Sequence, residues 1–174
     1  VQRVATGWES QFTIAADGIV SRTTLLELAE AFFALQPPTR VKIRDEILSG
    51  TLEALTSGQA DIAIGVVGDT GGTPDIQAKP LGVVPFIYAV APHHPLAGAA
   101  EPISDDTLRQ HRAIAVADSV QRGGGITVGL LHGQDVMTVP SMTTKIHAQL
   151  RGLGGGFLPE PAVRPSVQAG RRVA

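Results

Sequence analysis

The stretch at residues 48–65, LSGTLEALTSGQADIAIG, decides the fold because it joins a helix to a buried strand. The residues after Leu48 are small and polar, which suits a helix start whose N–H groups lack intrahelical acceptors. Apolar residues then repeat at helical spacing, and Gly58 is placed where a C-cap glycine belongs. The short apolar run at 62–64 is typical of a buried parallel strand. The stretch therefore predicts half of an α/β unit.

The residues before this stretch predict two further strands with a helix between them. The segment 12–16 is a strand, broken by the Asp-Gly pair that follows it. Thr24 and Glu27 form a capping-box pattern for a helix with a wide apolar face, which serves as core or as dimer interface. The prolines at 37–38 end that helix, and the alternation at 41–45 indicates a strand with one face toward water. This β-α-β-α-β series predicts a parallel sheet flanked by helices.

The residues after the stretch predict a second set of short elements separated by turns. The longest apolar run, LGVVPFIYAVA, reads as a strand that a proline interrupts. The expected elements are a strand at 81–91 interrupted by Pro85, a turn at 92–97, a helix capped by Ser104 and running to residue 108, strands at 113–117 and 136–139, a helix capped by Ser141 over 142–151, and a last helix over 161–168.

The composition excludes several classes of function. The chain has 174 residues with 43% hydrophobic and 17% charged residues, which is a globular composition. Its net charge of −2 and pI near 6.2 predict no electrostatic attraction to nucleic acid or to an anionic membrane. It contains no cysteine, and its five histidines lack metal-ligand spacing, so we expect no metal and no cofactor. No stretch is long and apolar enough to span a membrane.

Three motifs in sequence order resemble the effector-binding domain of LysR-type transcriptional regulators. The first is the strand Asp-Ile-Ala-Ile at 61–64, after a helix that ends in glycine. The second is the order Pro, His, Pro, Leu, Ala at 92–97, directly after an apolar strand. The third is GLGGGFLP at 152–159, which is similar to the family's Gly-Leu-Gly-x-x-x-Leu-Pro turn and strand. The resemblance covers residues 11–173.

The resemblance implies an α/β, two-lobed fold of the type 2 periplasmic-binding-protein kind, with mostly parallel sheets flanked by helices. It implies that residues 1–10 are the remnant of a linker from a DNA-binding domain. Residues 11–66 are then the first lobe and residues 67–174 the second. The family continues beyond the equivalent of residue 174 with a segment that returns to the first lobe, so we expect that segment to be absent here.

The candidate ligand site lies at the carboxyl ends of the strands, where ligands bind in open parallel sheets. Exposed N–H groups and hydroxyls at helix starts suit a carboxylate or another polar oxygen group. The alternative for each single residue is an ordinary helix cap, or for residues 65–66 a plain strand end, and Asp61 reads as a turn residue. The candidate effector-binding residues are Asp17, Ser21, Thr23, Ser49, Gly50, Thr51, Gly65, Val66, Asp118, Ser119 and Ser141.

The sequence therefore predicts a cytoplasmic regulatory domain that binds a small polar organic molecule in an inter-lobe cleft. As the resemblance implies, we expect a homodimer or tetramer, with DNA contacted only through a helix-turn-helix domain preceding this chain. A solute-binding protein for transport has the same fold and remains an alternative. An enzyme with this fold is a second alternative, but the sequence shows no set of catalytic residues. Ser119, for example, has no neighbouring histidine that would make it a nucleophile.

Overall fold

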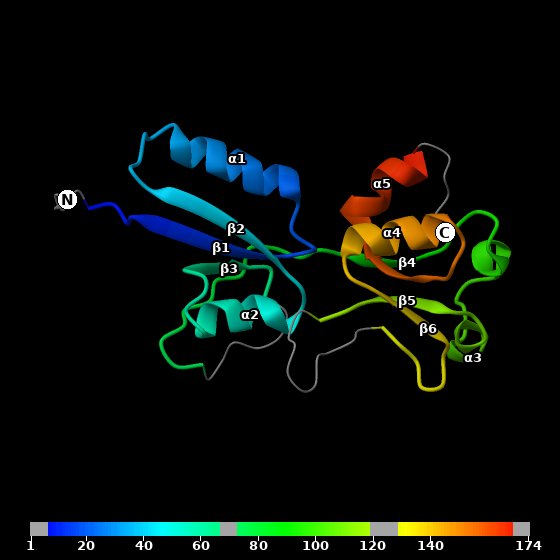
Figure 1. Ribbon diagram of the computed structural model, residues 1–174. Coiled ribbons are helices and arrows are strands. Elements are labelled where there is room, and N and C mark those ends of the chain that lie inside the picture. The colour runs from blue at the N-terminus through cyan, green and yellow to red at the C-terminus, as the bar shows by residue number, and fades with distance from the viewer. Residues whose placement is uncertain (1–6, 67–72, 119–128, 169–174) are drawn as a thin grey trace. The chain divides into compact units, whose positions relative to one another are not determined.

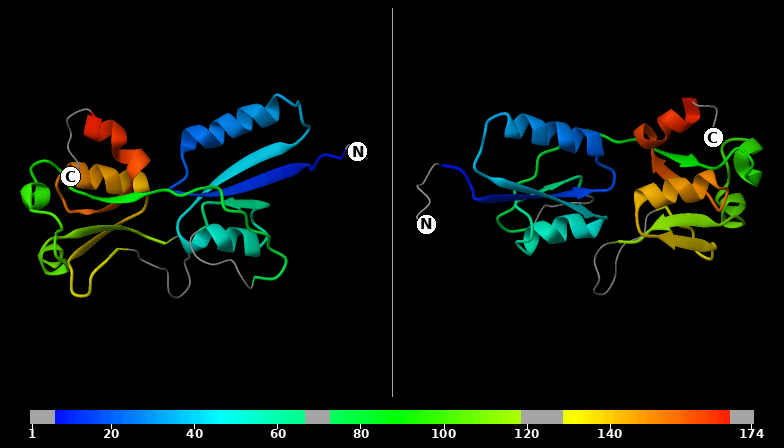
Figure 2. Two further views of the ribbon diagram at one scale, coloured as in Figure 1. Left: turned by 180° about the vertical axis from the view of Figure 1, so that it is seen from behind. Right: turned by 45° about the horizontal axis from the view of Figure 1, so that its top comes forward.

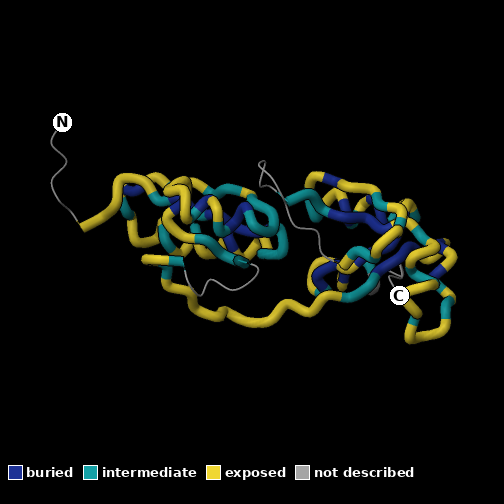
Figure 3. The backbone as a smooth tube through the Cα atoms, turned by 90° about the horizontal axis from the view of Figure 1, so that it is seen from below, coloured by how far each residue is buried: buried dark blue, intermediate teal, exposed yellow. Residues whose placement is uncertain are grey.

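The computed structural model describes residues 7–66, 73–118 and 129–168, which divide into two compact units. Among the described residues, those before residue 67 form unit 1 and those after residue 72 form unit 2 (Figure 1). Each unit has its own buried interior beneath an exposed surface (Figure 3). No helix in the described ranges has the length and apolar character needed to cross a membrane.

Unit 1 is a three-stranded parallel sheet between two helices. The sheet consists of β1 (Gln11–Asp17), β2 (Arg40–Glu46) and β3 (Ile62–Ile64) in the order β2-β1-β3. Helix α1 (Arg22–Phe33) lies on one face and α2 (Ser49–Thr56) on the other (Figure 1 and Figure 2). The predicted β-α-β-α-β series is confirmed. Because β1 is the central strand, its second half is buried on both faces.

The predicted capping box of Thr24 and Glu27 is wrong, because α1 begins at Arg22, two residues before Thr24. Ser21 is the N-cap: its backbone is extended, and its side chain accepts a hydrogen bond from the N–H of Thr24. Thr24 therefore lies inside the first turn. The helix ends at Phe33, before the two prolines, and only Leu25 of its residues is buried. The wide apolar face predicted for this helix is thus largely exposed to solvent in the isolated chain.

The described residues of unit 2 form four short strands. Strands β5 (Ala113–Val116) and β6 (Val136–Val139) are parallel, whereas β4 (Phe86–Ala89) and β7 (Gly156–Pro159) are antiparallel. A parallel bridge between Ala113 and Gly155 links the two pairs. Helix α4 (Met142–Leu150) packs across β5, β6 and β7, and α5 (Glu160–Gln168) packs on β7. Two short helices complete the unit: the 3-10 helix η1 (Pro95–Gly98) and α3 (Asp105–Arg109).

The predicted strand at 81–91 is wrong in its first half. Only Phe86–Ala89 pairs as a strand, and Leu81 and Val83 are 83% and 93% exposed. Pro85 has no N–H to donate to a neighbouring strand, and its carbonyl instead accepts the N–H of Glu160. The apolar character of residues 81–84 therefore does not reflect burial within this chain.

Candidate functional site

The carboxylate of Asp17 is the centre of the candidate site in unit 1. Asp17 ends β1 and is 3% exposed. One of its oxygens accepts the N–H of Ile19 at 3.1 Å. The other accepts the N–H of Leu48 at 2.8 Å and the hydroxyl of Thr51 at 3.2 Å. The carboxylate therefore ties the end of the central strand to the start of α2.

Thr51 points into the protein and not toward solvent. It is fully buried, and its neighbour Gly50 is buried as well, because this side of α2 packs on the sheet. Its hydroxyl donates to Asp17, which is the only hydrogen bond of that hydroxyl among the described residues. In the isolated chain Thr51 thus acts through Asp17, since solvent does not reach it.

Gly65 brings the end of β3 against the end of β1. Its φ of +82° is a conformation that other residues rarely adopt. A Cβ atom at this position would lie 2.9 Å from Val20 Cγ2 and 3.1 Å from Asp17 Cβ. The absence of a side chain at residue 65 therefore allows the end of β3 to approach the end of β1 and the loop that follows it.

Burial raises the pKa of Asp17 above its ordinary value of 3.8. The hydrogen bonds from Ile19, Leu48 and Thr51, together with the more distant charge of Arg22, act in the opposite direction. Among the described residues no cation pairs with this carboxylate, because Arg22 forms its ion pair with Asp45 at 2.8 Å. Backbone and hydroxyl donors therefore stabilise the carboxylate in place of a salt bridge.

The other predicted residues of unit 1 differ in how much solvent they meet. Ser21 caps α1 and is exposed, and Thr23 is exposed in the first turn of that helix. Ser49 and Val66 are half-buried. The structure thus gathers the predicted residues of this unit at one end of its sheet. Those that a solute reaches most readily are the hydroxyl residues Ser21 and Thr23.

The predicted residues of unit 2 occupy a comparable position. Val116 and Val139 are register partners in β5 and β6, so Asp118 and Ser141 follow the carboxyl ends of two neighbouring parallel strands. Ser141 caps α4 by accepting the N–H of Thr144 at 3.1 Å, which confirms the predicted cap. Asp118 is half-buried. Ser119 lies outside the described residues.

Lys145 is a residue that the sequence analysis did not consider. It lies in α4, one turn after Ser141, and is 6% exposed. Its ammonium donates a hydrogen bond of 2.7 Å to the carbonyl of Phe157, and burial lowers its pKa to about 8. Gly156 leaves the room for this side chain, since an added Cβ there would lie 3.1 Å from Lys145 Cε. A glycine that leaves room for a long side chain is recognisable only when both are placed in space.

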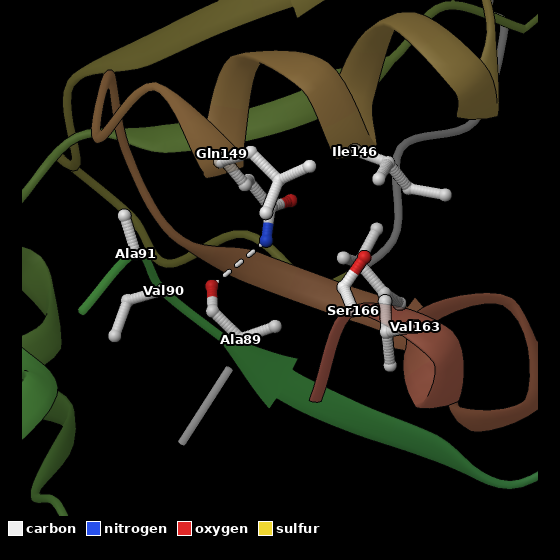
Figure 4. Close-up of a pocket in the computed structure, with 9 residues that line it drawn as sticks. Ala89, Val90, Ala91, Ile146, Gln149, Val163 and Ser166 are labelled. Carbon is white, nitrogen blue, oxygen red and sulfur yellow. Dashed lines mark hydrogen bonds between the residues drawn. The ribbon is translucent and has the colours of Figure 1, made fainter. Parts of the chain in front are cut away.

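A small recess lies elsewhere in unit 2, between α4, α5 and β4 (Figure 4). The amide of Gln149 donates a hydrogen bond of 2.8 Å to the carbonyl of Ala89, and Figure 4 marks this bond with a dashed line. The volume of the recess that the centre of a water molecule can occupy is about 10 Å³. This is enough for one water molecule and far too little for an organic ligand. Its lining includes none of the predicted site residues and consists of Ala89, Val90, Ala91, Ile146, Gln149, Leu150, Leu158, Val163 and Ser166.

The described residues contain no group of histidine and acidic side chains that fits a metal ion. The chemistry available at the strand ends is hydrogen bonding by hydroxyls and backbone N–H groups. This arrangement suits the binding of a polar ligand.

Comparison with known proteins identifies the domain. The family model described as "LysR substrate binding domain" matches residues 5–174. The uncharacterised HTH-type transcriptional regulator YeeY of Escherichia coli is 37% identical over 153 residues, which cover 88% of this chain and 50% of that protein. The chain spans about half to two thirds of the length of such regulators.

Solved structures share the fold. The C-terminal domains of a LysR family protein from Agrobacterium tumefaciens superpose with a TM-score of 0.64 at 22% identity, covering 94% of this chain and 79% of that one. The effector-binding domain of QuiR in complex with shikimate gives a TM-score of 0.61 at 15% identity, covering 86% and 73%. These matches confirm the predicted two-lobed, type 2 periplasmic-binding-protein-like fold class.

Proposed function

This chain belongs to the family of LysR substrate-binding domains, and on that premise we propose that it binds a small polar organic effector at its strand ends. The observation that carries the proposal is the convergence of Asp17, Thr51 and Gly65 at one end of the unit 1 sheet. Strand ends of this kind are where parallel sheets bind ligands. That a domain of the same fold is known with shikimate bound also supports a small organic molecule.

In this proposal Asp17 and Thr51 are positioning residues, and the groups nearer the surface contact the effector. Asp17 holds the first turn of α2 through Leu48 and Thr51. Ser21 and Thr23 offer exposed hydroxyls at the start of α1, which follows the end of β1, and Asp118 and Ser141 offer polar groups at the strand ends of unit 2. The remaining predicted residues, Ser49, Gly50, Gly65, Val66 and Ser119, stay predictions as ligand contacts.

A thermal-shift screen of aromatic acids, purines and amino-acid derivatives tests the proposal. A ligand at a hundred times its dissociation constant stabilises the native state by about 2.7 kcal/mol. For a domain of this size the melting temperature then rises on the order of 5–10 °C. If neither the screen nor calorimetry detects binding of any compound from these classes, the proposal that the effector belongs to one of them is contradicted.

Three serine caps provide a matched set of variants for the ligand found in this way. Ser21, Ser104 and Ser141 each cap a helix by accepting an N–H, but only Ser21 and Ser141 stand at the predicted site. We expect all three alanine variants to lose about 1 kcal/mol of folding stability. Ser21→Ala and Ser141→Ala should also reduce the ligand-induced shift, whereas Ser104→Ala should preserve it. Equal ligand shifts in all three variants would place the site elsewhere.

We further propose that the whole protein is a cytoplasmic transcriptional regulator that contacts DNA through a helix-turn-helix domain and associates through this domain as a dimer or tetramer. The relatives that share this domain are named HTH-type transcriptional regulators, which supports regulation over transport or catalysis. An effector that binds one arrangement of such an assembly more tightly than another would shift the assembly toward that arrangement.

A further inference from the structure

Lys145 is a buried cation without a counter-charge in the described part of the chain. It is 6% exposed, and within the described part of the chain its ammonium forms a hydrogen bond only with the neutral carbonyl oxygen of Phe157. None of the ion pairs among the described residues includes it. Outside those residues the sequence contains a single acidic residue, Asp69. A buried charge of this kind is unfavourable unless it is paired or neutralised.

The ammonium lies at the end of unit 2 where ligands are expected. Side chains on a helix point back toward its N-terminus, so Lys145 extends toward the first turn of α4. Its contact with Phe157 lies one residue farther along β7 than the contact of Gln149 with Gly156. The chain direction from Gly156 to Phe157 leads to the carboxyl end of β7. It also leads to the carboxyl end of β5, because the bridge between Ala113 and Gly155 is parallel.

The first turn of α4 adds donors beside this charge. Ser141 accepts the N–H groups of Thr144 and Lys145, through its hydroxyl and its carbonyl respectively. The N–H groups of Met142 and Thr143 precede them and have no acceptor within the helix. An ammonium carries three donors, of which the carbonyl of Phe157 engages one. Both groups favour the same kind of ligand, an anion.

We propose that Lys145 and the first turn of α4 bind a carboxylate, and that the effector of this domain therefore carries one. This inference rests on the proposed function and narrows its ligand class. A carboxylate at the start of α4 would give the buried ammonium a counter-charge. It would also accept hydrogen bonds from the N–H groups of the first turn, which have no acceptor within the helix. A neutral ligand would leave the ammonium unpaired. A phosphate is also an anion, and the test below distinguishes it from a carboxylate.

Nuclear magnetic resonance of the protein with 13C-labelled lysine provides a test that needs no variant. The lysines are Lys42, Lys79 and Lys145, and the first two are exposed. Benzoate at millimolar concentration should shift the Cε resonance of Lys145 and leave those of Lys42 and Lys79 unchanged. Benzamide, its uncharged analogue, should shift none of them. A Lys145 resonance that responds to neither benzoate nor inorganic phosphate would overturn the proposal, and a response to phosphate alone would overturn its carboxylate assignment.

Calorimetric titration with benzoate gives the second test. Lys145→Met should weaken benzoate affinity about 10- to 100-fold, because a charge-assisted hydrogen bond is lost. The matched control is Lys79→Met, an exposed lysine of the same unit, which should bind benzoate like the natural chain. Unchanged affinity in Lys145→Met would exclude this role of Lys145. If a neutral compound from the effector screen binds equally well to that variant, the proposed function survives and the anion inference alone fails.

Discussion

The N–H of Leu48 donates a hydrogen bond of 2.8 Å to the carboxylate of Asp17, across 31 residues of sequence. Leu48 adopts φ 53° and ψ −120°, a backbone conformation that is normally reserved for glycine. The bond therefore holds a strained residue at the point where α2 begins. Asp17 and Leu48 together fix where the first turn of this helix lies on the sheet.

Thr51→Ala should lower the stability of the unliganded domain. The substitution removes a hydroxyl donor from the buried carboxylate of Asp17. We expect a loss of about 1–3 kcal/mol in the free energy of unfolding, measured by urea denaturation. Thr56→Ala is the control, since Thr56 lies in the same helix but is exposed, and it should change stability by about 0.5 kcal/mol or less. Unchanged stability of Thr51→Ala with a smaller ligand shift would instead make Thr51 a direct ligand contact.

Gly65→Ala and Gly58→Ala separate backbone strain from crowding. Both glycines have positive φ, +82° and +76°, so alanine is strained at either position. Nothing lies within 4 Å of a Cβ added at Gly58, whereas at Gly65 it would meet Val20 Cγ2 at 2.9 Å. Gly65→Ala should therefore be more destabilising than Gly58→Ala by about 1–3 kcal/mol in thermal or urea unfolding. Equal losses would show that the strand ends at Asp17 and Gly65 are not closely packed.

His94 should make unit 2 sensitive to acid. Its ring is 8% exposed, and its Nδ1 accepts the N–H of Leu96 at 3.1 Å. Burial lowers its pKa below 6.5, and the neighbouring His111 and His93 lower it further. The folded state thus favours the neutral ring, while the unfolded chain takes up the proton near pH 6.5. The stability that depends on His94 is complete above pH 6.5 and decreases as the pH falls below it.

His94→Asn tests this pH dependence, because its side-chain oxygen can accept the same N–H without titrating. Its free energy of unfolding should change less between pH 7 and pH 5 than that of the natural chain. His132→Asn, at an exposed histidine of the same unit, should retain the natural pH profile. Identical slopes for His94→Asn and the natural chain would assign the acid sensitivity to other groups.

Phe33→Asp should weaken self-association. Phe32 packs edge-on against Trp8, with ring centroids 5.8 Å apart, whereas Phe33 is 50% exposed. With Leu26 at 60% exposure, α1 presents an apolar surface that the described residues do not cover. Sedimentation velocity should show a dimer for the natural chain and a larger monomer fraction for Phe33→Asp. Leu81→Asp changes an exposed apolar residue of unit 2, which is not part of α1, and should leave the dimer intact. A natural chain that stays monomeric at high concentration would contradict the expectation.

The sequence by itself determined the elements and their order, because the signals for them are local. Hydrophobic spacing gave the strand at 136–139 to the residue, and the serines at 104 and 141 marked helix starts through caps made within four residues. Local signals also placed the candidate residues at strand ends. They failed where two residues competed for one role, as when Ser21 and not Thr24 became the cap of α1.

Only the tertiary structure decided what the site residues do, because burial depends on which elements pack together. Thr51 follows a small polar run that favours exposure, yet packing of α2 on the sheet buries it and turns its hydroxyl to Asp17. Lys145 is charged and lies in a helix, yet it is buried, because Gly156 has no side chain and leaves space for it. Asp17 and Leu48 meet across 31 residues, a separation at which no spacing rule predicts a contact. Pairings at that range follow from the fold as a whole, since the packing of distant segments determines which polar groups lose water and must bond to each other.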